Sequence, residues 1–376
     1  MKKYVTLIVF EVLFLGAIGY CGDKELPAAE KADIDFKIGQ MVMVGFRGDD
    51  VNSTSIIAKD IRTRHLGGVI LFDYDYILKS PRNITSPEQL RLLTGKLQGL
   101  TPYPLLIAVD QEGGRVCRLN EINGFESASS AKYLGGVNDL SLTYKQASKI
   151  AKQLSQMGIN LNFAPVVDLD LNPSNQVIGR LERSFSADPN IVIAHAMKFI
   201  EAHHQQGVLC SLKHFPGHGS SFADSHLGFV DVTKTWSPVE LKPYEDIIKM
   251  GLADTVMTAH VFNANLDANN CTTLSKPIVT GLLRGKIGFD GVVISDCMNM
   301  EAIRGNYSFE DAIKRAIDAG VDIILISNNM VYDEDVAARA AATIKGLLKN
   351  GQITQDRINE SYERVRKLKS RLARGG

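Results

Sequence analysis

The sequence predicts an α/β protein with a (β/α)8 TIM-like barrel, one main domain and a C-terminal helix. Three observations predict this fold. Eight short apolar runs rich in β-branched residues recur along the chain, segments with helical spacing separate them, and polar residues stand where several of the runs end. Short runs buried on both faces are typical of parallel strands, and a barrel carries its active site where such strands end.

Each apolar run has the length of a buried strand. The runs are residues 41–46, 68–72, 105–110, 160–168, 208–214, 255–260, 292–296 and 322–327. An open doubly wound sheet is the rival fold, but the segment after the first run, GFRGDD, lacks the GxGxxG phosphate loop that often follows the first strand of such a sheet.

Candidate helices lie between the runs, at residues 141–157, 190–206, 277–286 and 309–319. The tail at residues 354–372 alternates in charge and carries apolar side chains at helical spacing, namely Ile358, Tyr362, Val365 and Leu368. We therefore predict a final helix that packs on the outside of the barrel.

The N-terminus has the pattern of an export signal, because Lys2 and Lys3 precede an apolar run at residues 4–20. This run is short for a membrane span, which needs about 20 apolar residues. Cys21, which follows the run, loosely resembles the lipidated cysteine of bacterial lipoproteins. We expect residues 1–21 to be a signal peptide, with an uncleaved anchor as the alternative. Residues 22–33 are then a spacer, and the protein is periplasmic or at the cell surface, with Cys21 as its candidate lipid attachment.

The composition excludes some classes of function. Lys and Arg together number 42 and Asp and Glu together number 42, so no basic excess indicates a nucleic-acid partner. The four cysteines after Cys21 show no CxxC spacing, which disfavours a zinc cluster or a dense disulfide framework. We predict that Cys117, Cys210, Cys271 and Cys297 are buried free thiols.

Polar residues end five of the predicted strands, and the ends of parallel barrel strands meet on one face. These residues are Asp110, Asp168, the pair Lys213–His214, His260 and Asp296. Asp296 ends the run VVISD, where a buried strand would hold a carboxylate rigidly at the barrel mouth. A glycosidase nucleophile needs such a fixed anion, although barrels also use strand-end Asp for binding alone.

The segment 212–226, LKHFPGHGSSFADSH, delivers Lys213 and His214 and then breaks into a loop at its Pro and Gly residues. Asp224 and His226, two residues apart, can pair so that the carboxylate orients the imidazole for general acid/base chemistry. The histidines at 214, 218 and 226 are also compatible with zinc, but a lysine and a Pro-Gly turn fit a metal cage poorly. We therefore predict no metal and no cofactor.

Two further segments carry groups suited to a sugar. DQEGGRVCR contains Asp110 and Arg118, which can accept and donate hydrogen bonds to hydroxyl or acetamide groups. ERSF adds Arg183. The alternatives are a solvated charged turn for the first segment and a surface ion pair for the second.

Together these segments resemble glycoside hydrolase family 3, in its single-domain β-N-acetylglucosaminidase branch. The matching segments are DQEGGRVCRL, NFAPVVDLD, ERSFSADP, KHFPGHGSSFADSH, MTAHVFNANLD and GFDGVVISDCMNM, within residues 36–330. KHFPGHG followed by DSH is specific to this branch. The resemblance implies that residues 34–376 form the catalytic domain.

The resemblance also implies roles for individual residues. Asp296 would be the nucleophile of a retaining mechanism, and His226 paired with Asp224 would be the acid/base. The terminal N-acetylglucosamine would be held by Asp110, Arg118, Arg183, Lys213 and His214. The expected activity is an exo-β-N-acetylglucosaminidase acting on peptidoglycan-derived or chitin-derived saccharides.

Four alternatives remain open from the sequence. Because a histidine acid/base does not repel an anion, phosphate could intercept the intermediate and make the enzyme a phosphorylase. A β-glucosidase would use the same site. A non-catalytic cell-wall-binding lipoprotein and a metal-dependent amidohydrolase are the readings from other classes.

Overall fold

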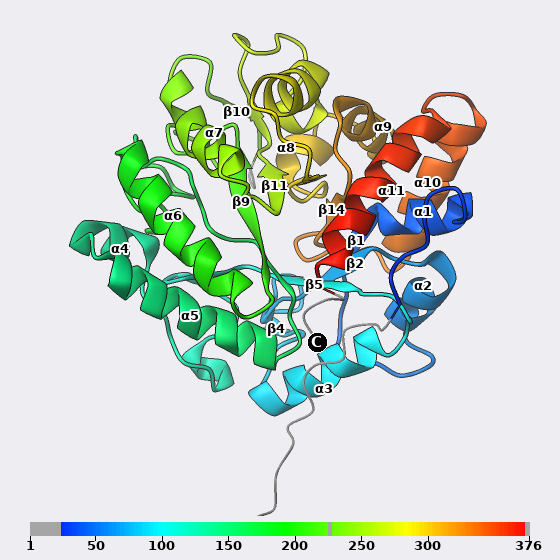
Figure 1. Ribbon diagram of the computed structural model, residues 1–376. Coiled ribbons are helices and arrows are strands. Elements are labelled where there is room, and N and C mark those ends of the chain that lie inside the picture. Colours follow the sequence, from blue (N-terminus) through cyan, green and yellow to red (C-terminus); the bar gives the residue numbers. More distant parts are fainter. Residues whose placement is uncertain (1–23, 225–227, 373–376) are drawn as a thin grey trace, which may run out of the picture.

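The computed structural model describes residues 24–224 and 228–372, and it places all eight predicted runs in one parallel sheet. The strands are β1 (Val42–Gly45), β2 (Gly68–Ile70), β5 (Leu106–Val109), β8 (Leu161–Asn162), β9 (Leu209–Phe215), β11 (Thr255–Thr258), β13 (Val292–Ile294) and β14 (Ile324–Ile326). Each strand lies beside the next one along the chain, and β14 pairs with β1. A parallel bridge between Ile294 and Ile323 joins the remaining edges, so the predicted barrel is confirmed (Figure 1).

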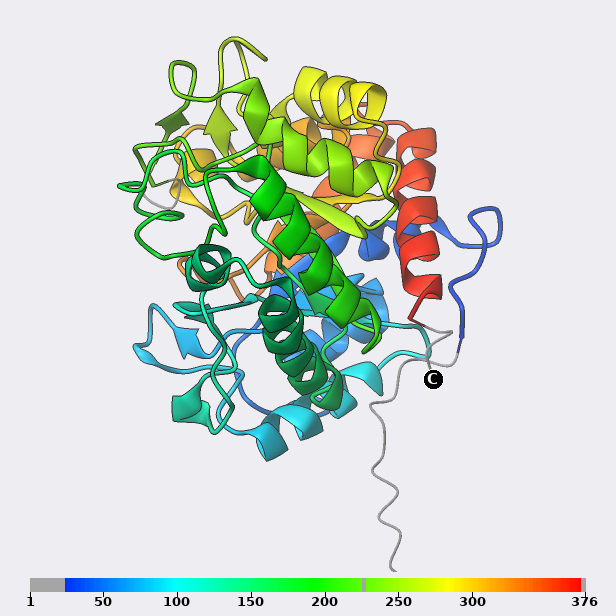
Figure 2. The same cartoon turned by 60° about the vertical axis from the view of Figure 1, so that its left-hand side comes forward.

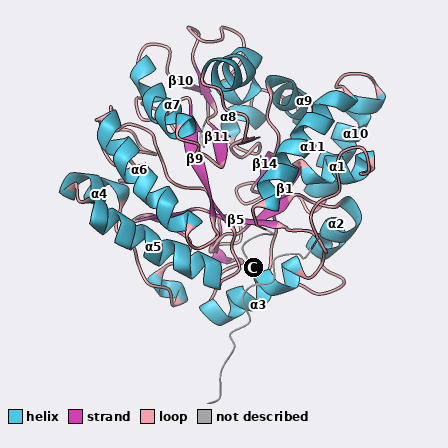
Figure 3. Ribbon diagram, viewed as in Figure 1, coloured by secondary structure: helices cyan, strands magenta, loops and turns pink. Residues whose placement is uncertain are grey.

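Helices surround the magenta strands in Figure 3, as the alternating pattern predicts. They are α1 (Ile34–Gln40), α2 (Ile56–Arg64), α3 (Pro87–Gln98), α4 (Ala131–Val137), α5 (Leu140–Gln156), α6 (Pro189–His204), α7 (Lys242–Lys249), α8 (Glu301–Arg304), α9 (Phe309–Ala319), α10 (Val336–Lys349) and α11 (Gln355–Ser370), with short helical turns η1 (Glu121–Asn123), η2 (Pro238–Leu241) and η3 (Thr272–Leu274). The predicted helix at 277–286 exists with those bounds as η4 (Pro277–Lys286), but it is a wider π-helix. Three two-stranded pairs complete the fold: β3 (Tyr74–Asp75) with β4 (Ser80–Pro81), β6 (Gln111–Gly113) with β7 (Val116–Cys117), and β10 (Val230–Asp231) with β12 (Val261–Phe262).

Strand β8 is much shorter than the predicted run at residues 160–168. Regular pairing ends at Asn162, a single hydrogen bond from the N–H of Ser211 to the carbonyl oxygen of Ala164 follows at 3.0 Å, and an isolated bridge joins Val166 to Lys213. Pro165 lies between them and has no N–H to donate to the ladder, which accounts for the interruption. The run nevertheless stays buried and still carries Asp168 to the strand-end face.

Helix α11 closes the end of the barrel where the strands begin. Val365, Leu368 and Leu372 belong to the same apolar cluster as the side chains inside the barrel, such as Leu106 and Ile294. In Figure 2 this red helix lies on the right, away from the loop-rich side on the left. The predicted tail helix is therefore present, but it closes the end of the barrel where the strands begin and does not only cover an outer face.

The described part of the predicted spacer packs against the same end. Leu26 is buried in a cluster with Phe36 and Tyr362, and the backbone N–H of Ala29 donates to Glu363 of α11 at 3.0 Å. Within residues 24–224 and 228–372, none of the helices is long and apolar enough to cross a membrane. Cys21 and the predicted signal lie outside the described residues.

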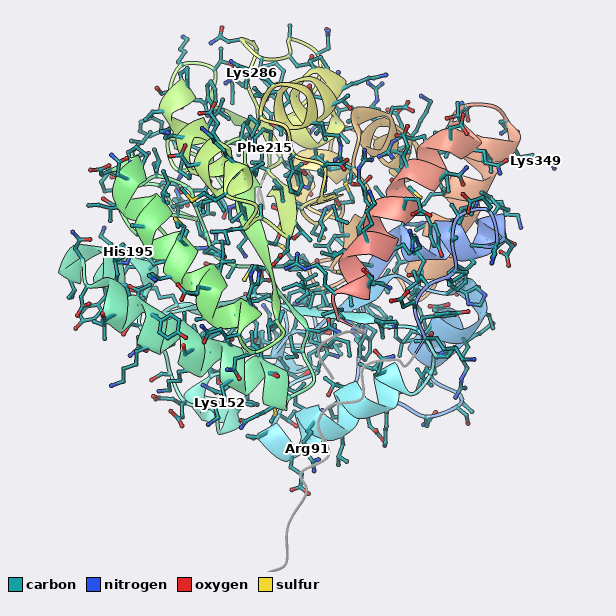
Figure 4. All side chains as sticks on the ribbon, viewed as in Figure 1. Arg91, Lys152, His195, Phe215, Lys286 and Lys349 are labelled. Atoms are coloured by element: carbon teal, nitrogen blue, oxygen red, sulfur yellow. The ribbon has the colours of Figure 1, made fainter. Side chains whose placement is uncertain are left out.

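The layer outside β9 shows how the helices hold the strand that carries the polar loop. Phe215, labelled in Figure 4, ends β9 and is fully buried. Its ring meets the ring of Tyr244 on α7 edge-on, with centroids 5.1 Å apart.

Three of the predicted thiols, Cys210, Cys271 and Cys297, are buried and free, while Cys117 is free but only half-buried.

Candidate active site

A cavity of about 500 Å³ opens at the ends of the barrel strands. Seven of the eight predicted site residues line it: Asp110, Arg118, Arg183, Lys213, His214, Asp224 and Asp296. The eighth, His226, lies outside the described residues. The size of the cavity suits a small ligand, and its position is the usual one for a barrel site.

Lys213 is the centre of a buried ion-pair network on the cavity floor. It is 2% exposed, and its ammonium lies 2.7 Å from Asp110 Oδ1 and 2.6 Å from Glu112 Oε1. Glu112 in turn accepts two hydrogen bonds from the Arg183 guanidinium, from Nε and Nη2, each at 2.8 Å. Two cations and two carboxylates therefore hold one another, and the surface ion pair considered for Arg183 is instead a buried fork.

The network keeps its carboxylates ionised. Burial alone would raise the pKa of Asp110, but Lys213 and Arg118 outweigh it and lower that pKa to about 2. The pKa of Glu112 is also lowered, because Arg183 and Lys213 outweigh the effect of burial. Asp110 is thus an anionic acceptor at neutral pH, which suits a group that binds sugar hydroxyls.

His214 is held as a neutral imidazole. Its Nδ1 lies 2.7 Å from Asp168 Oδ2, while its Nε2 lies 3.3 Å from Nη2 of Arg183. Burial lowers its pKa well below the usual value, and the nearby cations Arg183 and Lys213 lower it further. We assign the proton to Nδ1 from these partners, which leaves Nε2 as an acceptor on the Arg183 side.

Asp168 fixes the loop that follows β9. Its carboxylate accepts hydrogen bonds from the backbone N–H of His214 at 3.2 Å and from that of His218 at 2.8 Å. The loop also needs Gly219, since a Cβ there would lie 1.7 Å from the carbonyl oxygen of Leu169. This close packing sets the start of the segment that leads to Asp224.

A second loop supports the same segment from outside. The side-chain amide of Asn175 donates to the carbonyl oxygen of His218 at 2.8 Å and to Ser221 Oγ at 2.9 Å. Its oxygen accepts from the backbone of Val177 and Ile178, each at 2.9 Å. The polar stretch at residues 172–180 is therefore a packed support for the 214–224 loop.

Asp296 lies directly after β13 and is oriented by its own backbone surroundings. Its N–H donates to the carbonyl oxygen of Thr258 at 3.2 Å, and the next N–H, of Cys297, donates to Asp296 Oδ1 at 2.7 Å. Buried His260 lies behind it, with Nε2 3.0 Å from the carbonyl oxygen of Cys297. A carboxylate held this way at a cavity floor can accept a hydrogen bond or attack an electrophilic carbon.

Sequence reasoning assigned no role to Glu112, and it placed Asp168 and His260 only at strand ends. All three act through other site residues, which a pattern of strand ends cannot reveal. It also missed Tyr76 and Asn329, which line the cavity from loops far apart in the chain. Within the described residues, no group of three or more His, Cys, Asp or Glu side chains is arranged to hold a metal ion.

The chain matches known proteins over nearly its whole described length. Residues 33–368 match the family described as glycosyl hydrolase family 3 N terminal domain. A β-hexosaminidase from Xylella fastidiosa (strain 9a5c) is 33% identical over 332 residues, which cover 84% of this chain and 93% of that protein. Beta-hexosaminidase A from Pseudoalteromonas piscicida is 34% identical over 82% of this chain, but this chain spans only about half, 54%, of that protein.

Solved structures of the same family also resemble this chain. A glycoside hydrolase family 3 β-N-acetylglucosaminidase from Paenibacillus sp. str. FPU-7 superposes with a TM-score of 0.83 at 35% identity. The superposition covers 91% of this chain and 63% of that one. The barrel, the cavity at its strand ends and these matches lead to one conclusion: the chain belongs to glycosyl hydrolase family 3.

Proposed function

We propose that this chain is a retaining exo-β-N-acetylglucosaminidase that releases terminal β-linked N-acetylglucosamine from saccharides. The observation that carries the proposal is the gathering of Asp296, Asp224 and the ionised Asp110–Lys213 pair around one cavity. The names of the relatives, β-hexosaminidase and β-N-acetylglucosaminidase, support the same activity.

In the proposed mechanism, the Asp296 carboxylate attacks the anomeric carbon as the glycosidic C–O bond breaks. His226, oriented by Asp224, gives its proton to the departing oxygen, so the aglycone leaves as a neutral alcohol. His226 then takes a proton from water, which attacks the same carbon and breaks the bond to Asp296. The sugar leaves with its original β configuration, and both side chains return to their first states.

The binding groups fit a neutral, hydroxyl-rich ring. Asp110 accepts hydrogen bonds, and Arg118 and Arg183 donate them. Neutral His214 adds an imidazole ring to the same part of the cavity. Because Lys213 is paired with both Asp110 and Glu112, its charge orients these acceptors.

The test is hydrolysis of a chromogenic β-N-acetylglucosaminide and of the matching β-glucoside by the protein without residues 1–21. We expect release from the first substrate and at least tenfold slower release from the second. No release from either would overturn the enzyme proposal, and faster release from the glucoside would make the chain a β-glucosidase.

The same assay with added phosphate tests the phosphorylase alternative. A hydrolase releases free N-acetylglucosamine at a rate that phosphate does not raise. A faster rate with N-acetylglucosamine 1-phosphate as the product would replace the hydrolase proposal. Binding to cell-wall fragments without turnover of any substrate would support the binding-lipoprotein reading, and loss of activity with a chelator would support the amidohydrolase.

We also propose that the chain is exported and attached to a membrane through a lipid on Cys21. The lysines at positions 2 and 3, the apolar run and the cysteine support this proposal. The full chain should then fractionate with membranes and incorporate a labelled fatty acid, and Cys21→Ser should release it and remove the label. Equal fractionation of both forms would contradict lipid attachment.

A further inference from the structure

The cavity differs between its floor and its rim. The floor is formed by buried charged groups such as Lys213, whereas the rim carries large exposed side chains. Tyr76 is 50% exposed and Met330 is 45% exposed, yet both line the cavity. An exo-acting glycosidase places the terminal sugar on the floor, so groups at the rim meet the next part of the substrate.

Tyr76 stands on a rigid support. It follows β3, whose Asp75 is 1% exposed and accepts hydrogen bonds from the N–H groups of Ile77 at 3.0 Å and Leu78 at 2.8 Å. Arg82 lies 3.1 Å from the same carboxylate. Arg47, whose Nε lies 2.7 Å from this carboxylate, is the fourth partner, and the four contacts shape the turn that presents the Tyr76 ring.

The turn is also tied to the wall that carries Met330. The N–H of Tyr76 donates to Asn329 Oδ1 at 3.3 Å, and the Asn329 amide donates back to the carbonyl oxygen of Tyr74 at 3.0 Å. The Tyr74 and Tyr76 rings meet edge to face, with centroids 5.7 Å apart and planes at 87°. The ring of Tyr76 is therefore placed before any ligand arrives, so little conformational entropy is lost on binding.

We propose that Tyr76, with Met330 on the same cavity rim, is the platform for the aglycone sugar, the pyranose ring on the leaving side of the scissile bond. A pyranose has an apolar face of C–H groups and a polar edge of hydroxyls. An exposed tyrosine matches the face, and the exposed polar side chains of Arg115 and Gln176 on the same rim can meet the edge. This inference rests on the proposed function and names its preferred substrate, a β-linked saccharide.

The test compares two substrates that share the terminal sugar. N,N′-diacetylchitobiose has an aglycone ring, whereas β-N-acetylglucosaminyl fluoride has none. Tyr76→Ala should lower kcat/KM for chitobiose about tenfold, mainly through a higher KM, and change the value for the fluoride less than about twofold. Tyr76→Phe keeps the ring and should restore the chitobiose value.

Tyr133→Ala is the matched control, because Tyr133 is 56% exposed on α4 and does not line the cavity. It should leave both substrates unchanged. If Tyr76→Ala lowers turnover of both substrates equally, or of neither, the proposed role of Tyr76 as a platform is wrong, while the proposed function stands. If the unaltered chain cleaves neither substrate, the proposed function fails and the platform falls with it.

A third substrate separates two sources of the ring. The disaccharide of N-acetylglucosamine and N-acetylmuramic acid from peptidoglycan also presents a pyranose to Tyr76. A loss for both disaccharides supports recognition of the shared ring, and a loss for one alone supports the platform and identifies the saccharide it serves.

Discussion

At the scale of single residues, different contacts hold the predicted binding groups and the proposed nucleophile. Lys213 forms ion pairs with Asp110 and Glu112, and Arg183 forms a further ion pair with Glu112, so neighbouring cations balance both carboxylates. Asp296 Oδ1 accepts a hydrogen bond from the backbone N–H of Cys297 at 2.7 Å. This contact fixes the carboxylate at the end of β13, which is consistent with Asp296 as the proposed nucleophile, because an attacking carboxylate must be oriented toward the carbon.

Asp296→Asn should lower kcat for an aryl β-N-acetylglucosaminide by about 10³-fold or more, because an amide is a poor nucleophile. Steady-state kinetics measures the loss. A 5-fluoro glycosyl fluoride should label the unaltered chain on Asp296, as peptide mass spectrometry can show. The control is Asp290→Asn at an acid whose side chain is 80% exposed. Labelling at another carboxylate would contradict the assignment.

His226→Ala tests the acid/base. The aryloxide of an activated aryl glycoside departs with little protonation. The variant should therefore lose about 10²-fold less kcat/KM on these substrates than on chitobiose. Kinetics over a series of leaving groups gives this margin. Added azide should speed the variant on aryl substrates by attacking the intermediate. An equal loss on all leaving groups would exclude His226 as the acid.

At the scale of elements, the loop after β9 is held from behind by the short turn η2. Glu240 of η2 is 1% exposed and lies against Gly217, where a Cβ would come within 2.7 Å of Glu240 Oε2. Burial raises the pKa of Glu240 to about 7, and the nearby Asp168 carboxylate raises it further. The loop that leads to Asp224 therefore packs on a carboxyl group that titrates near neutrality.

The sign of the pH dependence follows from the raised pKa. Its value in the unfolded chain is near 4.5, so the contribution of Glu240 to stability is complete below that pH and is lost as pH rises through about 7. The full loss is about 3 kcal/mol at most. Glu240→Gln mimics the neutral form, so it should gain stability relative to the unaltered chain between pH 5 and pH 8.

Urea unfolding at the two pH values measures this gain. Glu201→Gln is the control, because the Glu201 side chain is 46% exposed and should show no such trend. An identical pH dependence in Glu240→Gln and the unaltered chain would mean that Glu240 is not held protonated by the fold.

At the scale of the whole molecule, the two ends of the barrel have separate tasks. The strand ends form the cavity, while α11 and η4 seal the opposite end around the fully buried Asp322. Asp322 meets Arg284 at 2.5 Å, Arg357 at 3.3 Å and Arg364 at 3.4 Å. It also accepts from the N–H of Val293 at 3.0 Å, so this carboxylate joins β13 to the strand β14 that follows it.

Asp322→Asn should lower the free energy of unfolding by about 3–5 kcal/mol, because it leaves the buried guanidinium groups without their anion. Chemical denaturation measures the loss, and kcat of the folded fraction should change little because the cavity lies at the other end. Asp290→Asn, which removes only an exposed partner of Arg364, should cost less than about 1 kcal/mol. Equal losses from the two variants would contradict the role of Asp322 in sealing the barrel.

Much of the fold could be predicted because its signals are local. Apolar runs such as 292–296 and helical spacing such as 309–319 report burial and periodicity within a few residues, and a barrel brings all strand ends to one face. That rule predicts that Asp110, Lys213 and Asp296 lie together, and all three line the cavity. The resemblance added roles for Asp224 and His226, which remain predictions.

The sequence by itself thus determined the barrel, its eight strands and the face that carries the site. Only the tertiary structure decided which side chains meet there: Glu112 between Lys213 and Arg183, Asp168 beneath His214, and Tyr76 tied to Asn329 across 253 residues. The physical reason is that such contacts depend on loop conformation and side-chain packing between distant segments. Local periodicity specifies how a segment is buried, but not which distant partner it reaches.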